Sequence, residues 1–435
     1  MIITGVLYMF LARMQLFSAR YLLPIAGEPI ENGALVVDGG IIVALGKEKE
    51  MLDRYPSAER HDLGSSALMP GLVNAHAHLD LVLSDLPWSE SHFVQSILSL
   101  VDYKKVQSVE ERRESIQSGL KKSLSSGTTC LADVGSYLDP GSLVDGIGLR
   151  LVAFSEILLS SKGGPSIHQV FESALSFVEE MKAAGGGRIQ AGIAPYAPFM
   201  LSRHLLKVLA QHAVESKIPL QMHVAESFSE MQFFYDSKGD VADLLFAHAG
   251  WGKDLPPPHR KTPIEYLASI GFLDAAPSLV GCLHLSDADL KSIRQAHATV
   301  VHCPRSNVNL KLGKAPIRKI LDAGIPVGLG TDLTFRQGSV SLWEEMRAAL
   351  ELHGSDASSS LTSTEILEMA TLGGATVLRL EDSIGSLEPG KKADFIVVTA
   401  KEKISLKELS AWLIRHTVEG SVKEVYLDGR ALKHG

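Results

Sequence analysis

The sequence lacks the features that mark several classes of protein. It has only three cysteines in 435 residues, Cys130, Cys282 and Cys303, and they form no C-x-x-C pair. We therefore expect no disulfide framework and a reducing compartment, the cytoplasm. There is no excess of positive charge either, because 42 Lys and Arg stand against 50 Asp and Glu, a net charge of −8. This balance argues against general binding to nucleic acid or to a membrane surface.

Long apolar runs are also missing. The most apolar stretch, residues 2–12, is shorter than the roughly 20 residues that cross a bilayer. It also lacks the basic segment that precedes the apolar core of a secretory signal. We interpret it as a first β-strand or as residues that precede a native start at Met14, which N-terminal sequencing of the native protein would test.

What the sequence does contain is an alternation of short apolar, β-branched runs with longer amphipathic stretches such as 111–127, 168–187, 202–217 and 287–298. This alternation is typical of βαβ units and a parallel sheet. Eight such units fit the size of an α/β protein with a (β/α)₈ TIM barrel. The eight runs are 66–78, 127–134, 150–157, 188–198, 218–226, 279–285, 298–304 and 326–332.

Both ends of the chain have a different texture, with strand-like runs and Asp-Gly turns within 19–63, 393–400 and 422–432. Two terminal β pieces can pair into one small domain, which we expect to be a β-sandwich. The predicted division is therefore 1–64 and 381–435 for the two parts of the β domain, and 65–380 for the barrel.

Metal-ligand residue types gather at the predicted strand ends. The first run ends in His76-Ala77-His78, and residues two apart on a strand point the same way. His223, His284 and Asp332 end the fifth, sixth and eighth runs. Because the catalytic groups of such barrels lie at the carboxyl ends of the strands, we expect these side chains to meet around zinc or a similar divalent ion.

These residues and their order resemble the amidohydrolase superfamily, in the branch that includes triazine hydrolases and nucleoside deaminases. The segments that carry the resemblance are PGLVNAHAHLDL (70–81), HVAES (223–227), LHL (283–285), HCPRSN (302–307), GLGTD (328–332) and GSLEPGKKADFIV (385–397). The resemblance implies that His76, His78, His223 and Asp332 bind the metal, with His284 beside it. It also implies one metal ion, zinc or iron, because the fourth run has no bridging lysine.

The residues suggest a hydrolytic chemistry. A divalent ion makes water a nucleophile near neutral pH, and Asp332 can orient that water and accept its proton. Glu226 follows His223 by three residues, so it can carry a proton to a ring nitrogen and to departing ammonia, as in base deaminases. The alternative for Glu226 is a solvated loop carboxylate. His284 would polarise the attacked centre or the nucleophile.

For the substrate, HAHLDL, HCPRSN and SLWEEMRAAL (341–350) look most like aminofutalosine deaminases, which convert 6-amino-6-deoxyfutalosine to futalosine in menaquinone biosynthesis. Enzymes acting on adenosine, methylthioadenosine or S-adenosylhomocysteine are similar nearly everywhere. Arg305 and Arg336 are candidates for binding a benzoate carboxylate, or each meets solvent or a neighbouring carboxylate. Tyr196 either contacts the substrate or packs at the barrel rim. We expect a small-molecule nucleoside as the partner and leave open whether the chain forms a homodimer.

Four further residues are of types that could serve a site, and two of them lie in a long loop. His302 and Cys303 fit packing roles, whereas His248 and His259, in a long loop over 237–263, either contact substrate or solvent. Two rival functions are a hydrolase of cyclic amides or chlorinated rings, and an inactive barrel that serves as a scaffold. The complete set of His, Glu and Asp at the strand ends speaks against the scaffold.

Overall fold

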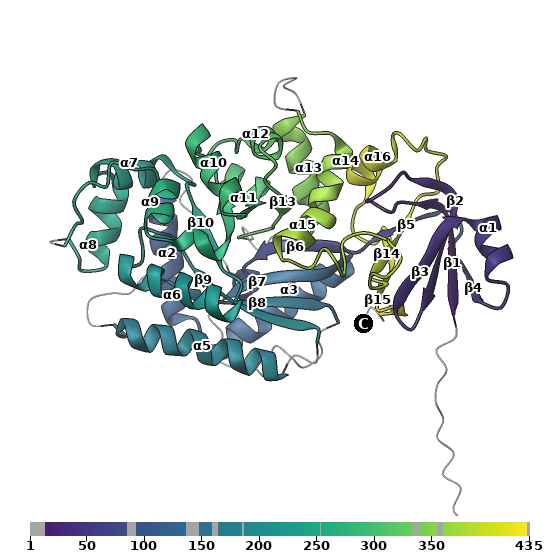
Figure 1. The fold of residues 1–435 in the computed structure, drawn as a ribbon, viewed down its shortest axis with the longest axis horizontal. Coiled ribbons are helices and arrows are strands. Elements are labelled where there is room, and N and C mark those ends of the chain that lie inside the picture. The colour runs from purple at the N-terminus through teal and green to yellow at the C-terminus, as the bar shows by residue number, and fades with distance from the viewer. Residues whose placement is uncertain are drawn as a thin grey trace, which may run out of the picture.

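The fold consists of a barrel and, at one side of it, a sheet built from both ends of the chain (Figure 1). The computed structural model describes residues 14–84, 93–135, 148–158, 164–184, 187–252, 254–333, 339–354 and 360–432. The apolar run at 2–12 and Arg336 lie outside these ranges. No helix within them is long and apolar enough to cross a membrane.

Eight parallel strands form the barrel. They are arranged as two four-stranded sheets whose edge strands lie side by side. Isolated parallel bridges close it, from Ile193 to Leu220 on one side and from Ala77 to Asp332 on the other. Every predicted run supplies one strand, which confirms the TIM barrel. The strands are β6 (Leu72–Ala77), β7 (Thr128–Gly135), β8 (Arg150–Ile157), β9 (Ile189–Pro195), β10 (Gln221–Val224), β11 (Ser278–Gly281), β12 (Thr299–His302) and β13 (Val327–Leu329).

Helices surround the barrel strands and bury their apolar faces on them (Figure 1). Side-chain caps define where several begin. Ser108 and Glu111 form a reciprocal capping box at one helix start, and Thr262 and Glu265 do so at another. The helices are α2 (Phe93–Val106), α3 (Val109–Ser125), α5 (Ile167–Ala184), α6 (Arg203–Ser216), α7 (Phe228–Asp236), α8 (Phe246–His248), α9 (Pro263–Ser269), α10 (Asp287–Gln295), α11 (Pro304–Asn309), α12 (Ile317–Asp322), α13 (Leu342–His353), α14 (Ser363–Met369), α15 (Leu372–Val377) and α16 (Leu409–His416).

Short helical turns occupy three connections: η1 (Leu79–Leu81), η2 (Val241–Leu245) and η3 (Phe272–Ala275). The segment 237–263 was expected to be one long loop. In the structure it contains the π-helical turn η2, which is followed directly by α8. Its burial explains the difference: Val241, Leu245 and Phe246 pack into the main core, and a buried backbone must satisfy its own hydrogen bonds.

The two ends of the chain form one eight-stranded mixed sheet, ordered β16-β15-β14-β5-β1-β2-β3 with β4 beside β1. Alternate residues of its strands bury two separate apolar clusters, as the period of two requires. The small β domain expected from both termini is confirmed, and its strands form one mixed sheet where a β-sandwich was expected. Its elements are β1 (Gln15–Leu22), β2 (Ile30–Asp38), β3 (Ile41–Lys47), α1 (Glu48–Arg54), β4 (Glu59–Asp62), β5 (Ser66–Pro70), β14 (Phe395–Thr399), β15 (Val422–Leu427) and β16 (Arg430–Ala431).

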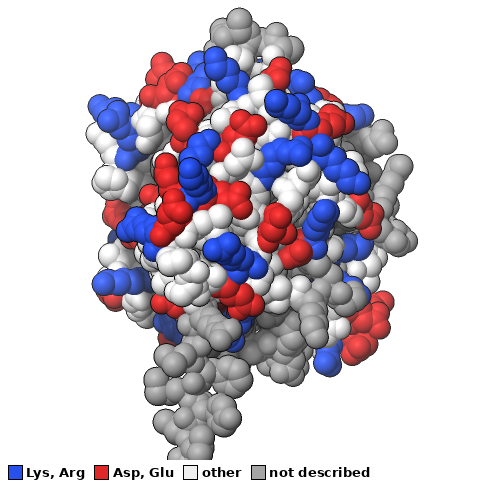
Figure 2. Space-filling model, turned by 90° about the vertical axis from the view of Figure 1, so that its right-hand side faces the viewer, with Lys and Arg blue, Asp and Glu red and all other residues white. Residues whose placement is uncertain are grey.

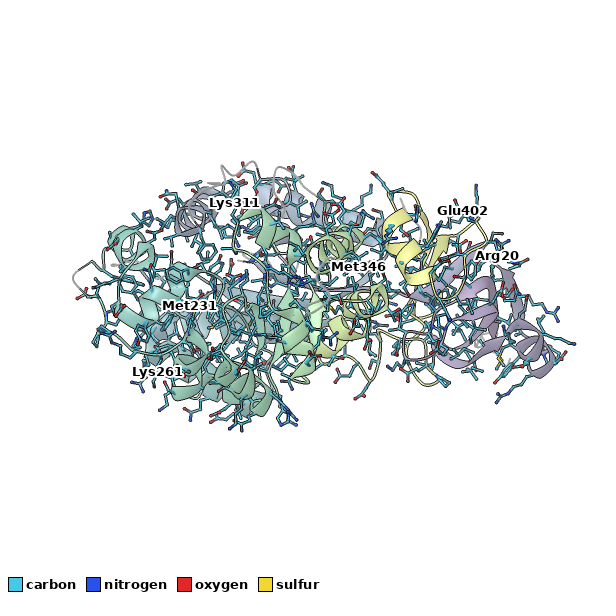
Figure 3. The ribbon with its side chains drawn as sticks, turned by 90° about the horizontal axis from the view of Figure 1, so that it is seen from above. Arg20, Met231, Lys261, Lys311, Met346 and Glu402 are labelled. Atoms are coloured by element: carbon cyan, nitrogen blue, oxygen red, sulfur yellow. The ribbon has the colours of Figure 1, made fainter. Side chains whose placement is uncertain are left out.

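Contacts between distant parts of the chain fasten this sheet. Arg20 donates to the backbone carbonyl groups of Lys401 and Glu402, and Arg20 and Glu402 lie close together at one end of Figure 3. The predicted run at 66–78 divides between the two parts: β5 pairs with β1 and β14, whereas β6 enters the barrel. The chain thus crosses from sheet to barrel at Gly71, and the division at 64/65 and 380/381 stays a proposal.

A partly buried arginine joins the barrel to the terminal sheet. Arg150, the first residue of β8, pairs with Asp394 through Nε at 2.6 Å and with Asp428 through Nη2 at 2.6 Å. The face of the molecule on this side carries Lys and Arg interspersed with Asp and Glu (Figure 2). Among the residues described on that face, therefore, no large basic patch is available to a polyanion.

Candidate metal centre

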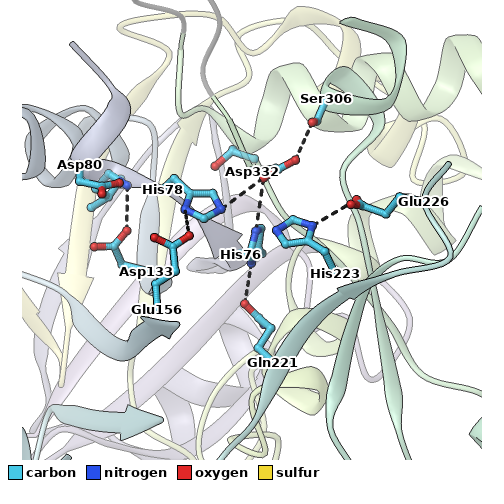
Figure 4. A network of polar contacts seen from close by, with 12 residues as sticks. His76, His78, Asp80, Asp133, Glu156, Gln221, His223, Glu226, Ser306 and Asp332 are labelled. Atoms are coloured by element: carbon cyan, nitrogen blue, oxygen red, sulfur yellow. Dashed lines mark hydrogen bonds and ion pairs between the residues drawn. The ribbon is translucent and has the colours of Figure 1, made fainter. Parts of the chain in front are cut away.

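Four predicted ligands meet at the carboxyl end of the barrel (Figure 4). One ligand atom from each of His76, His78, His223 and Asp332 lies within 4.8 Å of the other three, and all four residues are buried. His76 and His78 come from the end of β6, His223 from β10, and Asp332 follows β13. Three imidazoles and a carboxylate are a donor set suited to zinc or a similar first-row ion.

The atoms that face one another lack hydrogen bonds. Nε2 of each of the three histidines and Oδ1 of Asp332 are buried without a hydrogen-bond partner among the described residues. Oδ1 of Asp332 is 3.4 Å from Nε2 of His76 and 3.6 Å from Nε2 of His78. Each unsatisfied buried polar group costs about 1–3 kcal/mol. A single cation among these four atoms would satisfy all of them, so the residues fit a metal ion.

In three of the four ligands, the side-chain nitrogen or oxygen that points away from the site has a hydrogen-bond partner. His76 Nδ1 is 2.5 Å from the side-chain oxygen of Gln221, and His223 Nδ1 is 3.1 Å from Oε1 of Glu226. Ser306 donates its hydroxyl to Oδ2 of Asp332 at 2.5 Å. A metal-binding imidazole usually donates its second N–H in this way, which fixes the tautomer. The contacts therefore leave each Nε2 lone pair facing the site.

Closure of the barrel positions Asp332. The backbone amides of Thr331 and Asp332 both donate to the carbonyl group of His76, at 2.8 and 3.0 Å. Asp332 takes a left-handed conformation with φ of 49°, a strained choice for a residue with a side chain. At Gly330 a Cβ atom would lie 2.9 Å from the backbone oxygen of His76. Only glycine lets the strand approach this closely.

Glu226 also depends on a close approach. A Cβ atom at Gly281, where φ is +94°, would lie 2.3 Å from the Glu226 side chain. Ala225, which precedes Glu226, has a left-handed backbone conformation with φ of 53°. Its carbonyl group accepts hydrogen bonds from the backbone amides of Leu283 and His284. The turn after β10 is thus fastened to the turn after β11. It buries Glu226 against His223, so the solvated carboxylate considered as an alternative is excluded.

Burial and charge adjust the protonation of the cluster. Burial lowers the pKa of His78 well below its ordinary value, and the Lys104 ammonium group lowers it further. This histidine is therefore neutral at neutral pH, which is the form that binds a metal. Burial also lowers the pKa of His223, but the carboxylates of Glu226 and Asp332 outweigh it and raise that pKa to about 9. The centre thus attracts positive charge, whether a proton or a metal ion.

Three comparisons with known proteins bear on this site. The model of the amidohydrolase family matches residues 67–432. The chain belongs to the amidohydrolase family. It is 29% identical over 432 residues to a 5-methylthioadenosine/S-adenosylhomocysteine deaminase of Saccharophagus degradans, covering 95% of this chain and 90% of the relative. The predicted family and the prediction of an enzyme that hydrolyses carbon–nitrogen bonds are confirmed.

Solved structures agree with this family. An adenosine deaminase from Xanthomonas campestris with bound zinc has a TM-score of 0.79 and 25% identity, covering 96% of this chain and 92% of that one. A Helicobacter pylori aminofutalosine deaminase in complex with methylthio-coformycin has a TM-score of 0.84 and 22% identity, covering 96% of this chain and all of the other. The second likeness concerns the fold alone.

Two other predicted residues, His284 and Tyr196, lie close to the ligand cluster or to the Glu226 turn. His284 is half-buried beside the Glu226 turn, through its backbone bond to Ala225. Tyr196 is buried, and its ring lies 4.9 Å from that of the ligand His223. Burial raises the pKa of Tyr196 well above its ordinary value, so its hydroxyl stays protonated. Its packing on His223 supports the ligand.

Arg305 meets neighbouring carboxylates. Its Nη1 lies 2.9 Å from Glu344 and 3.5 Å from Glu345, and it donates to the carbonyl group of Ser339. Arg305 was expected either to bind a substrate carboxylate or to meet solvent or a neighbouring carboxylate, and the structure shows it paired with neighbouring carboxylates. Its guanidinium group is therefore already neutralised, and the expected role in binding a substrate carboxylate is not favoured. Arg336 lies outside the described residues.

Histidines outside the ligand set have partners of their own. His302 and His353 are buried and share a contact of 3.2 Å between their Nε2 atoms. His248 contacts Asp102 at 3.1 Å, and His259 stacks on Phe234. Cys303, like the other two cysteines, is buried and free.

The sequence reasoning missed the residues that hold the ligands. Gln221 and Ser306 contact His76 and Asp332, but a buried amide within a strand or a serine in a first helical turn carries no signal of its role. Glu156 and Lys104 were likewise missed. Glu156 is the last residue but one of β8, so the rule that searches strand ends could have found it.

A cavity of about 740 Å³ lies on the same end of the barrel. It is lined by the segment that follows β9, by α7 and by the chain between α8 and α9. Its volume is in the range of small-molecule sites. The lining is largely apolar, with Arg203 and Asp254 as its charged residues, and its aromatic members include Phe199, Phe233, Phe234, Phe246, Trp251 and Tyr266.

We predict that His76→Ala removes the metal. Loss of one of four ligands should leave purified protein with less than about a tenth of the metal content of the unchanged protein. His302→Asn is the matched control, because it alters another buried strand-end imidazole outside the cluster. Elemental analysis, with circular dichroism to confirm folding, measures the result. Equal metal content in both variants would remove His76 from the site.

Proposed function

We propose that this amidohydrolase is a metal-dependent deaminase that replaces the 6-amino group of an adenosine-like nucleoside with oxygen and releases ammonia. The observation that carries the proposal is the buried cluster of unsatisfied ligand atoms, with the Glu226 carboxylate against the ligand His223. The deaminase relative, similar along 95% of this chain, supports the same reaction.

A divalent ion, zinc with iron as the alternative, would be held by His76, His78, His223 and Asp332 and would supply the Lewis acidity that makes water nucleophilic at neutral pH. One ion is proposed, because β9 offers no lysine to bridge a second. Zinc is favoured by the imidazole-rich donor set and by the zinc in the Xanthomonas campestris structure.

The protons are moved by two carboxylates. Asp332 accepts the proton of the attacking water, since its Oδ2 is already bound to Ser306 and its Oδ1 faces the site. Glu226 delivers one proton to the ring nitrogen and another to the leaving amine, and the two protons of the attacking water, one of them passed on by Asp332, replace those that Glu226 gives up, so that water and the amino compound give the oxo compound and ammonia. His284, beside the Glu226 turn, polarises the attacked carbon centre or the nucleophile.

The large cavity suggests which nucleosides are accepted. We infer that it takes an apolar substituent at the ribose 5′ position, because its lining is largely apolar. The methylthio group of methylthioadenosine fits this class directly. S-adenosylhomocysteine and 6-amino-6-deoxyfutalosine, the latter connecting the chain to menaquinone biosynthesis, would place their apolar portions on the same lining and their carboxylates near Arg203. The relatives named above favour the first two, since the aminofutalosine deaminase is similar in fold only.

We predict that Glu226→Gln lowers turnover by about 10²–10⁴-fold while metal content stays near normal. The glutamine oxygen can still accept the bond from His223, but the amide cannot carry a proton. Ammonia release from methylthioadenosine, S-adenosylhomocysteine, adenosine, aminofutalosine and guanine measures turnover, and elemental analysis measures the metal.

Glu230→Gln is the matched control for this variant. Glu230 is equally buried, accepts from the Glu226 amide at 2.9 Å, and has a pKa raised to about 8 by its burial. It is therefore largely protonated at neutral pH, and glutamine imitates it. Turnover within a few-fold of normal is expected. A Glu226→Gln protein as active as this control would refute the proton transfer.

We predict that Ile167→Trp narrows the cavity and discriminates between substrates. Ile167 lines the cavity from an exposed position at the start of α5, so a larger ring there need not disturb the core. The kcat/KM for S-adenosylhomocysteine should fall at least about tenfold, with that for adenosine changed by less than about threefold. Val109→Trp, an exposed position outside the cavity, is the control. An equal loss for both substrates would contradict the assignment of the cavity.

A further inference from the structure

A buried ion cluster lies next to the metal centre and takes no part in the mechanism above. Lys104, on α2, places its Nζ 3.0 Å from Oδ2 of Asp80 and in contact with Oε2 of Glu156. The side chain of Lys104 is 3% exposed, and the two carboxylates are fully buried. Burying three charges is costly unless they pair closely, so such a group calls for a functional reason.

The free oxygen of Glu156 faces a metal ligand. Oε1 of Glu156 is 3.7 Å from Nδ1 of His78, as the dashed line in Figure 4 marks. Neither atom has a hydrogen-bond partner among the described residues. The outward atoms of the other three ligands are held by Gln221, Glu226 and Ser306. Glu156 is thus the group in place to hold the fourth.

Lys104 fixes the orientation of Glu156. Its ammonium group engages Oε2, which leaves Oε1 directed at His78. The helix that carries it is itself tied down, because Arg112 donates to the Lys104 carbonyl group at 3.2 Å and Gln107 donates to the Asp80 carbonyl group at 2.7 Å. Burial lowers the pKa of Lys104, but its two carboxylates outweigh that effect and raise it, so the cation persists.

We propose that Lys104 is a positioning residue of the metal centre, which acts through Glu156 to hold the His78 ring with Nε2 toward the metal. In this proposal Oε1 of Glu156 is the acceptor for the Nδ1 proton of His78, once the 3.7 Å separation closes to hydrogen-bond distance, and this contact selects the tautomer that can bind. The inference rests on the metal site of the proposed function and is independent of the substrate.

The test measures zinc affinity by chelator competition on metal-stripped protein. Glu156→Leu removes the acceptor but keeps the Lys104–Asp80 pair, and it should raise the Kd for zinc by about 10–100-fold. Lys104→Met should raise it by a similar factor. The control is Lys105→Met, the adjacent residue, whose exposed pair with Asp102 makes no contact with the site; its Kd should change by less than about twofold.

The double variant Lys104→Met/Glu156→Leu decides whether Lys104 acts through Glu156. If it does, the Kd of the double variant equals that of Glu156→Leu within about twofold, because the two losses are not additive. Multiplication of the two single effects would overturn the proposal. An unchanged Kd for Glu156→Leu would overturn it as well, even if Lys104→Met does not fold.

The melting temperature of the metal-free proteins separates positioning from a purely structural role. A lower melting temperature with an unchanged zinc Kd in Lys104→Met would contradict the proposal. These experiments measure zinc affinity and not deaminase turnover. A failure to release ammonia from any nucleoside would therefore contradict the proposed function but would not contradict this inference.

Discussion

The structure depends on the contact that closes the barrel, where β13 meets β6. The first and last strands of the barrel are some 250 residues apart in sequence, and the amides of Thr331 and Asp332 join them by donating to His76. The same contact brings the Asp332 carboxylate to the two histidines of the H-x-H pair. Closing the fold and assembling the metal centre are therefore one event, and Gly330 permits it by leaving room for the backbone of His76.

In the four ligand side chains, the atoms that face the site lack hydrogen bonds, whereas the atoms that face away from it are bonded to or face neighbouring residues. Four inward atoms have no partner among the described residues, at a cost of about 1–3 kcal/mol each. Three outward atoms are held by Gln221, Glu226 and Ser306, and Glu156 faces the fourth. A cation that binds only the folded chain recovers this cost and stabilises the fold. In the proposed function, substrate specificity is a separate matter, assigned to the residues that line the cavity.

Much of the fold and the ligand set could be predicted because they follow from periodicity. Eight apolar runs gave the strands, and the alternation of strand side chains placed His76 and His78 on one side. The rule that catalytic groups gather at strand ends then selected His223 and Asp332 together with His284, and the resemblance to the amidohydrolases set His284 beside the metal, which left four ligands. Those four positions are fixed by local sequence and barrel topology together.

The remaining features depend on contacts that no local pattern encodes. Arg305 was a candidate for the substrate, but Glu344 and Glu345, some 40 residues later, neutralise it. Lys104 lies on a helix next to Lys105, and only the tertiary fold buries one and exposes the other. The run at 66–78 reads as one strand, yet its first half pairs with β1 and β14 in the other sheet.

The central claim is that three imidazoles and one aspartate hold a single cation. X-ray absorption at the zinc edge, on protein loaded with one equivalent, tests it most directly. The account predicts a shell of nitrogen and oxygen at about 2.0–2.2 Å with the outer scattering of three imidazole rings. Sulfur at about 2.3 Å, or scattering from fewer than three imidazoles, would contradict it.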